Sequence, residues 1–224
     1  MSGVKDQIRQ TYDALVESGD VTEIRAFGDK QTVSGYFDNG DDFVAAAHRM
    51  DLRGYEVYVT LNRVDPALFA RAANRTKERP KNTTSDRDVL RRQWLLLDFD
   101  CVRPSGVSST EAEKEAAELR AREVREYLRG RGWPDPVVGD SGNGYHLLYR
   151  IDLPNDQEST DLVKNVLQAL AFRFDDEKVK VDTSVYNAAR ISKVYGTMAR
   201  KGDDVPGRPH RRSELLKVPT EVNV

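Results

Sequence analysis

The segment Trp94-Leu95-Leu96-Leu97-Asp98-Phe99-Asp100 joins an apolar run to two aspartates. A short apolar run that ends in polar residues is typical of a buried β-strand. Because strand side chains alternate between faces, Asp98 and Asp100 share one face. Two neighbouring carboxylates repel one another, and a divalent cation such as Mg²⁺ or Mn²⁺ removes that repulsion. The segment therefore predicts a sheet strand that carries a metal site, whereas an isolated Asp-x-Asp is alternatively a solvated strand edge or a helix cap.

Periodic apolar positions on both sides of this segment predict alternating helices and strands. Upstream we expect helices over residues 4–17 and 43–50 and strands over residues 21–27 and 55–61. Downstream we expect, in order, a helix over 109–130, strands over 136–138 and 145–151, a helix over 157–174 and a strand over 179–182. The order strand, helix, hairpin, helix, strand matches the split βαβ arrangement of ferredoxin-like and palm-type folds. The predicted fold class is therefore α/β (α+β), with an N-terminal α/β module over residues 1–90 and a second module over residues 91–224.

The bulk composition excludes several classes of protein. Hydrophobic residues make up 38% and charged residues 32% of the 224 positions, as in ordinary globular proteins. The single cysteine, Cys101, rules out an internal disulfide and a thiolate-rich zinc site, so oxygen atoms are the expected metal ligands. The sequence lacks both the run of about 18 to 20 apolar residues that a membrane span needs and a secretory signal. We therefore expect a cytoplasmic protein without a membrane partner.

Two basic stretches, over residues 71–92 and 190–217, stand out against a formal net charge of -2. Charge runs are often only solvated faces, so a role in nucleic-acid binding depends on their position near the acidic segment. The candidate nucleic-acid contacts are Arg75, Lys77, Arg91, Arg92, Arg200, Lys201, Arg211 and Arg212. Residues 74–87 lack a periodic apolar pattern and are expected to form a mobile basic loop.

A glycine-rich turn, Ser141-Gly142-Asn143-Gly144-Tyr145-His146, leads into the strand over residues 145–151. Glycine and asparagine adopt the positive φ angles of tight hairpins, so the turn can be purely structural. The alternative depends on His146, which follows the turn at a point where exposed glycine amides and an imidazole can receive a triphosphate.

Asp182 ends the last expected strand and is a third potential metal ligand. Eight residues later comes the basic segment Arg190-Ile191-Ser192-Lys193-Val194-Tyr195-Gly196-Thr197. Cations beside a metal-binding carboxylate can neutralise the phosphates of an incoming nucleotide.

Taken in order, Asp98-Phe99-Asp100, Ser141 to His146, and Asp182 with the segment 190–197 resemble the three motifs of the archaeo-eukaryotic primase superfamily. The resemblance covers about residues 55–202 and is greatest to the primase-polymerases of phages, plasmids and CRISPR-associated loci. It implies an RRM-like catalytic module beside the N-terminal α/β module. It also implies a DNA primase or DNA polymerase that joins nucleoside triphosphates to a 3′-hydroxyl, using two Mg²⁺ or Mn²⁺ ions and releasing pyrophosphate.

The resemblance assigns roles to individual residues. Asp98, Asp100 and Asp182 match the catalytic, metal-binding carboxylates. The positions that match nucleotide contacts are Ser141, Gly142, Gly144, His146, Arg190 and Lys193. The implied partners are single-stranded DNA template, primer and nucleoside triphosphates, together with helicases or other replication or CRISPR-associated proteins. Candidates for the side chain that crowds the sugar 2′ position are Tyr145, Tyr149 and Tyr195.

Two other functions are compatible with parts of the sequence. The apolar run before Asp98 also resembles the nucleophile strand of haloacid-dehalogenase-type phosphatases. That family requires an acid four residues after a later Gly-Asp pair, and here Gly144 occupies that position after Gly139-Asp140. The second alternative is a non-catalytic replication module that only binds nucleic acid, and the retention of three acids and His146 argues against it.

Overall fold

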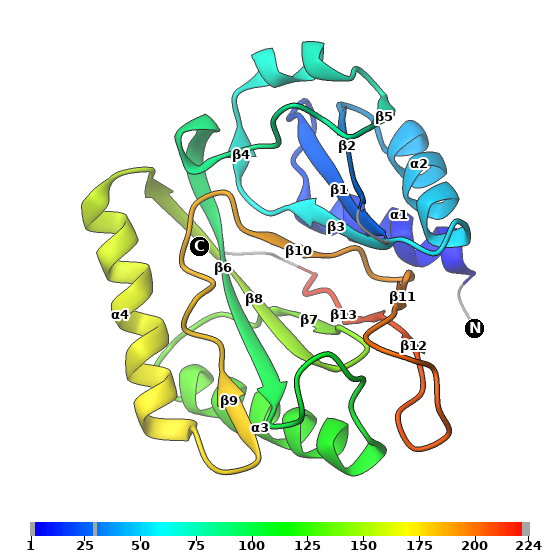
Figure 1. Cartoon of the computed structure of the whole chain (residues 1–224). Helices are drawn as coiled ribbons and strands as arrows, with labels where there is room; N and C mark the ends of the chain where they lie inside the picture. The colour runs from blue at the N-terminus through cyan, green and yellow to red at the C-terminus, as the bar shows by residue number, and fades with distance from the viewer. Residues whose placement is uncertain (1–2, 29–30, 221–224) are drawn as a thin grey trace.

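The computed structural model describes residues 3–28 and 31–220, which form two antiparallel sheets with helices on their outer faces (Figure 1). The first sheet has the strand order β10-β3-β1-β2-β5. Its strands are β1 (Thr22–Gly28), β2 (Gln31–Phe37), β3 (Glu56–Thr60), β5 (Arg75–Glu78) and β10 (Ile191–Lys193). Helices α1 (Val4–Leu15) and α2 (Gly40–Leu52) cover one face of this sheet (Figure 1).

The second sheet has the order β13-β7-β8-β6-β4, and β9 pairs with β6 on the side not used by β8. Its strands are β4 (Arg63–Val64), β6 (Val89–Cys101), β7 (Val137–Asp140), β8 (Gly144–Pro154), β9 (Val179–Val181) and β13 (Glu214–Lys217). Helices α3 (Glu111–Arg129) and α4 (Gln157–Phe174) lie on the side of this sheet away from the first one (Figure 1). The remaining elements are the 3₁₀ helices η1 (Pro66–Arg71) and η2 (Asp86–Asp88) and a ladder of β11 (Met198–Ala199) with β12 (Arg211–Arg212).

Local sequence signals explain where the two long helices begin. Thr110 caps α3 by accepting the Glu113 N–H, and the Glu113 carboxylate accepts the Thr110 N–H in return, which completes a capping box. Asp156 caps α4 by accepting the Ser159 N–H at 2.8 Å. Both caps satisfy N–H groups that the first turn of a helix leaves without partners.

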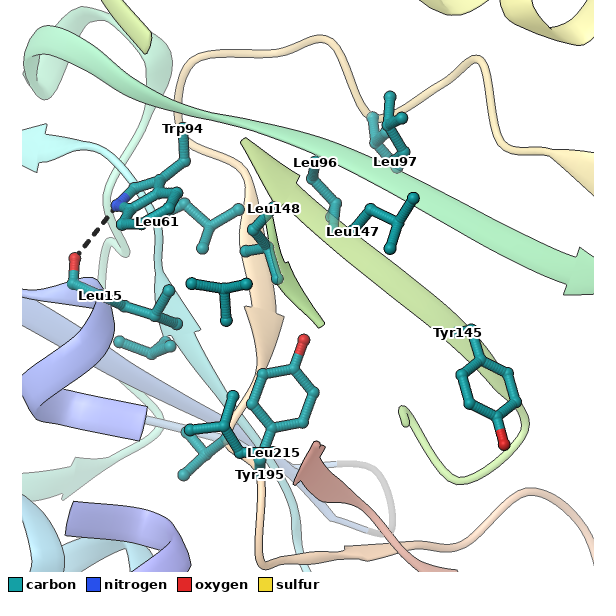
Figure 2. Close-up of a cluster of buried hydrophobic side chains, with 14 of the residues drawn as sticks. Leu15, Leu61, Trp94, Leu96, Leu97, Tyr145, Leu147, Leu148, Tyr195 and Leu215 are labelled. Atoms are coloured by element: carbon teal, nitrogen blue, oxygen red, sulfur yellow. Dashed lines mark hydrogen bonds between the residues drawn. The ribbon is translucent and has the colours of Figure 1, made fainter. Parts of the chain in front are cut away.

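One buried apolar cluster joins the two sheets and fixes their relative position (Figure 2). Trp94 and Leu96 of β6 lie in this cluster with Leu15 of α1 and Leu61 after β3. The Trp94 indole Nε1 donates a hydrogen bond to the Leu15 carbonyl at 3.2 Å. The same face of β6 that carries Asp98 and Asp100 therefore packs against the first sheet, which places the aspartates at the junction between the sheets.

The predicted fold class is confirmed, and both long helices and β6 to β9 lie close to their predicted residues. The strand β2 was not predicted from the sequence, and β5 lies within residues 74–87, which were expected to form a mobile loop. The boundary at residue 90 is crossed in both directions, because β4 pairs in the second sheet and β10 pairs in the first. Within the described residues, no helix is both long enough and apolar enough to cross a membrane.

Candidate active site

A cavity of about 110 Å³ lies where β3 and β10 of the first sheet face β6 and β8 of the second. Six of the sequence-predicted site residues line it: Asp98, Asp100, Ser141, His146, Lys193 and Lys201. The other lining residues are Glu56, Tyr58, Arg103, Asn143 and Ala199. The structure thus brings together the first two predicted motifs and Lys193, which are distant in the sequence.

The two aspartates of β6 differ in their electrostatic environment. Burial raises the pKa of Asp100, and the Asp98 charge raises it further, while Arg103 Nη1 at 3.3 Å from Asp100 Oδ1 offsets this only partly. Burial also opposes ionisation of Asp98, but the charge and hydrogen bond of His146 outweigh it and lower the Asp98 pKa. One carboxylate is therefore held ionised while its neighbour is pushed towards the neutral acid, as expected for two carboxyl groups that share one site.

His146 is held between Asp98 and a fully buried tyrosine. It lies opposite Asp98 in the β6–β8 register, with Nε2 3.4 Å from Asp98 Oδ1. Its other ring nitrogen, Nδ1, is 2.9 Å from the Tyr195 hydroxyl and 3.4 Å from Ser192 Oγ. Tyr195 reaches this position because Gly139 has no side chain: a Cβ there would lie 2.2 Å from the tyrosine ring. These contacts fix the plane of the imidazole and direct Nε2 into the cavity.

The glycine-rich turn connects β7 to β8 and is held by its own hydrogen bonds. Gly142, at φ 94°, donates its N–H to Asp140 Oδ1 at 2.7 Å. The Gly144 N–H donates to Ser141 Oγ at 3.0 Å. Both glycine amides are therefore engaged within the turn, contrary to the expectation that they are exposed to receive an anion. The residues of this turn that line the cavity are Ser141, Asn143 and His146.

Gly144 allows β8 to approach β6 beside Asp100, its partner in the register. A Cβ at Gly144 would lie 2.3 Å from the Phe99 carbonyl oxygen, which belongs to the backbone of the paired strand. We expect Gly144→Ala to lower the free energy of unfolding by about 2 to 3 kcal/mol, measured by urea denaturation. Gly130→Ala, at a helix end where the nearest atoms are 3.5 Å away, is the matched control and should have a small effect. Equal stability of the two variants would contradict this prediction.

Asp182 follows β9 and lies opposite Asp98 in the extended register of β6 and β9. Its N–H donates to the Asp98 carbonyl at 2.9 Å, and its Oδ1 accepts the Ser184 N–H at 2.8 Å. Asp182 is not a lining residue of the cavity, and residues 3–28 and 31–220 contain no cluster of three His, Cys, Asp or Glu side chains able to hold a metal ion. The backbone therefore places the third acid beside the pair, while its carboxylate caps the following turn.

The two basic residues predicted to contact nucleotide are engaged in different ways. Lys193 is buried in the cavity wall, where its Nζ donates to Glu56 Oε2 at 2.9 Å and to the Met198 carbonyl at 2.8 Å. Arg190 lies outside the cavity wall and donates to Asn187 Oδ1 at 2.9 Å and to the Ser184 carbonyl at 3.2 Å. Its charge helps to lower the Asp98 pKa.

Three residues that line the cavity were not predicted as site residues: Glu56, Tyr58 and Arg103. Glu56 and Tyr58 are two residues apart on β3, so their side chains share one face of the strand. The sequence alone did not show that this face of β3 would meet β6. Tyr145, Tyr149 and Tyr195, proposed for sugar selection, are all buried, and Tyr58 is the tyrosine that lines the cavity.

Most of the basic residues singled out as nucleic-acid contacts have partners within the chain. Arg92 is buried and donates to the Tyr186 carbonyl at 2.8 Å and to Thr160 Oγ1 at 2.7 Å. Four further arginines form ion pairs: Arg91 with Asp152, Arg200 and Arg212 with Asp51, and Arg211 with Glu111. Arg75 and Lys77 are exposed on β5, and Lys201 lines the cavity. Sequence charge alone did not distinguish structural arginines from exposed ones.

Comparisons with known proteins show the fold of the chain. No protein-family model and no curated protein sequence matches it. Among solved structures, it resembles primase RepB′ at a TM-score of 0.50 and 13% identity, covering 96% of this chain but only 56% of that one. It also resembles the polymerase domain of Mycobacterium tuberculosis ligase D in complex with DNA, at a TM-score of 0.50 and 18% identity, covering 93% of this chain and 79% of that one. The chain therefore shares its fold with primase RepB′ and with this polymerase domain.

Proposed function

We propose that this protein is a nucleotidyltransferase of the primase and polymerase class, which joins nucleoside triphosphates to a 3′-hydroxyl on a single-stranded DNA template. The observation that carries the proposal is the convergence of Asp98, Asp100, Ser141 and His146 in one cavity between the two sheets. The shared fold supports this class over a phosphatase.

The donor set of the cavity fits a divalent metal. Asp98 and Asp100 present hard oxygen ligands on one strand face, and burial together with the Asp98 charge raises the pKa of Asp100, both of which a cation would offset. Asp98 and Asp100 would hold Mg²⁺ or Mn²⁺, with Asp182 as the third candidate ligand. When bound there, the metal would supply activation of the 3′-hydroxyl and neutralisation of the triphosphate charge, with pyrophosphate as the leaving group.

The remaining polar groups are suited to binding and orienting the triphosphate. His146 presents Nε2 to the cavity from a ring fixed by Tyr195, and the Ser141 hydroxyl lies at the same wall. Lys193 and Lys201 add positive charge, although Lys193 must share its ammonium with Glu56. A preformed arrangement of donors stabilises charge without reorganisation, so these residues would act by positioning.

A thermal-shift measurement provides a first test. A nucleoside triphosphate with Mn²⁺ is expected to raise the melting temperature by about 5 °C at saturating concentrations, because ligand that binds only the folded state stabilises it. Nucleotide or Mn²⁺ alone should produce a much smaller shift, since the carboxylates and the triphosphate repel one another without the cation. Equal shifts with and without Mn²⁺ would refute metal-dependent nucleotide binding.

Primer extension on a single-stranded DNA template then tests the reaction. We expect incorporation of labelled nucleotide with release of pyrophosphate, in the presence of Mg²⁺ or Mn²⁺. Release of inorganic phosphate from small phosphoesters without extension would instead identify a phosphatase. DNA binding without either reaction would identify a non-catalytic nucleic-acid module.

A further inference from the structure

A second cavity, of about 150 Å³, lies in the N-terminal part of the chain between the first sheet and the loop after β5. Its floor is formed by Ser34 and Tyr36 of β2, and Pro80 and Asn82 of the loop form part of its rim. The remaining lining residues are Arg71, Ala72, Lys77 and Lys81. We call this the Arg71 cavity; its lining carries three cations and no acid.

The Arg71 guanidinium is held in place by the surrounding structure. Its Nη1 donates to the Tyr36 hydroxyl at 3.2 Å and lies 3.5 Å from the Thr83 carbonyl, and Asp88 is 3.9 Å away. Lys77 and Lys81 are exposed, and within the described residues neither pairs with a carboxylate. A fixed guanidinium with two mobile ammonium groups is a suitable set of donors for a phosphate.

Strand register places the Arg71 cavity on the same sheet face as the catalytic cavity. Residues directly opposite one another in paired strands point to the same face. One such row runs across all five strands: Lys77, Ser34, Arg25, Tyr58 and Lys193. Lys77 lines the Arg71 cavity and Lys193 lines the catalytic cavity. Five neighbouring strands have four spacings between them, which separates these two lysines by about 19 Å.

The sheet face between the two cavities carries a partly exposed aromatic side chain. Phe27 of β1 is 39% exposed and packs edge-on against Tyr58, with ring centroids 5.6 Å apart. Proteins bind single-stranded nucleic acids with exposed aromatic rings that stack on the bases and nearby cations that neutralise the phosphates. Within the row itself, Ser34 is buried and Arg25 donates to the Thr84 carbonyl at 3.0 Å, so a strand that links the two cavities would pass over the loop after β5.

We propose that the Arg71 cavity binds a phosphate group of the DNA strand that enters the catalytic cavity. The proposal rests on the proposed function and deepens it by naming a second anchoring site for the nucleic acid. An anchor about 19 Å from Lys193 would hold the strand by its backbone, independently of base sequence. The phosphate would be either an internal phosphodiester or a terminal phosphate of the strand.

The double variant Lys77→Ala/Lys81→Ala tests the proposal by fluorescence anisotropy, with labelled single-stranded DNA titrated at several salt concentrations. We expect about a tenfold loss of affinity and a salt slope reduced by about 1.4, because two phosphate contacts are lost. The control double variant Lys5→Ala/Lys178→Ala removes the same charge from exposed sites elsewhere and should leave the slope unchanged. Both doubles should keep the Mn²⁺-dependent thermal shift with nucleotide.

The outcomes separate this proposal from the proposed function. Equal loss with oligonucleotides that carry or lack a 5′-phosphate supports an internal phosphodiester, and loss restricted to the phosphorylated strand supports a terminal phosphate. Matching affinities and slopes for the two double variants would overturn the proposal, even if primer extension is intact. The proposal would also be wrong if inorganic phosphate bound at the Arg71 cavity but left the affinity for DNA unchanged. If the wild type shows no nucleotidyl transfer but DNA binding is reduced in Lys77→Ala/Lys81→Ala and not in the control, only the proposed function is overturned.

Discussion

Asp98→Asn is expected to reduce nucleotide incorporation by about 10³-fold or more while leaving the protein folded. Asp98 is the carboxylate of the pair that stays ionised, because His146 lowers its pKa despite burial. The amide removes a negative charge that a divalent cation requires but keeps the size of the side chain. The measurement is single-turnover primer extension at saturating Mg²⁺ or Mn²⁺, with circular dichroism to verify folding.

Asp152→Asn is the matched control for this variant. Asp152 lies on β8, the strand that pairs with β6, and its side chain is 50% exposed and contacts Arg91. The control should retain incorporation, because an exposed ion pair contributes little to stability and Asp152 is remote from the cavity lining. Extension by Asp98→Asn at the rate of the control would show that Asp98 is not a catalytic ligand.

Asp51→Asn is expected to lower the free energy of unfolding by about 3 kcal/mol at neutral pH, because it leaves two arginines without their carboxylate. Asp51, at the end of α2, is buried and accepts the Met198 N–H at 2.9 Å. Arg200 and Arg212 lie 3.1 and 3.0 Å from its two carboxylate oxygens. This carboxylate therefore ties the C-terminal segment, which lines the catalytic cavity through Lys201, to helix α2.

The same residue predicts a pH dependence. Burial alone would raise the Asp51 pKa, but the Met198 N–H and the two arginines outweigh burial and lower it. A carboxyl with a lower pKa in the folded state stabilises the fold above its unfolded pKa of about 3.9 and loses this contribution as the pH falls. Urea unfolding should show a large difference between the wild type and Asp51→Asn at pH 7 and a much smaller one near pH 3.

Asp41→Asn is the control for the stability measurement, because Asp41 lies in the same helix with a side chain 94% exposed and contacts Arg9. It should change the free energy of unfolding by less than about 1 kcal/mol. A difference between the wild type and Asp51→Asn that does not shrink at low pH would contradict the role assigned to the ionised carboxylate.

The secondary structure followed from local patterns because these depend on residues close together in the chain. The apolar run before Asp98 predicted β6 and the shared face of the two aspartates, and the caps at Thr110 and Asp156 mark the starts of α3 and α4. The strand β2 was missed, since its serine and glycine, Ser34 and Gly35, interrupt the apolar pattern. Gly35 is required there, because a Cβ would lie 2.2 Å from the Arg75 carbonyl of β5.

The sequence by itself determined the element order, the paired aspartates of β6 and the position of His146 after a tight turn, since alternation and turn chemistry are local properties. The tertiary structure alone decided which charges remain available. Arg200 pairs with Asp51, which is 149 positions away in the sequence, and Lys193 pairs with Glu56, which is 137 positions away. Neither carboxylate partner could be recognised from the sequence. The tertiary structure also decided that β10 pairs with β3 in the first sheet, so that Lys193 of β10 and Tyr58 of β3 both line the cavity with the aspartates. Such contacts depend on how distant strands pack, which no local pattern encodes.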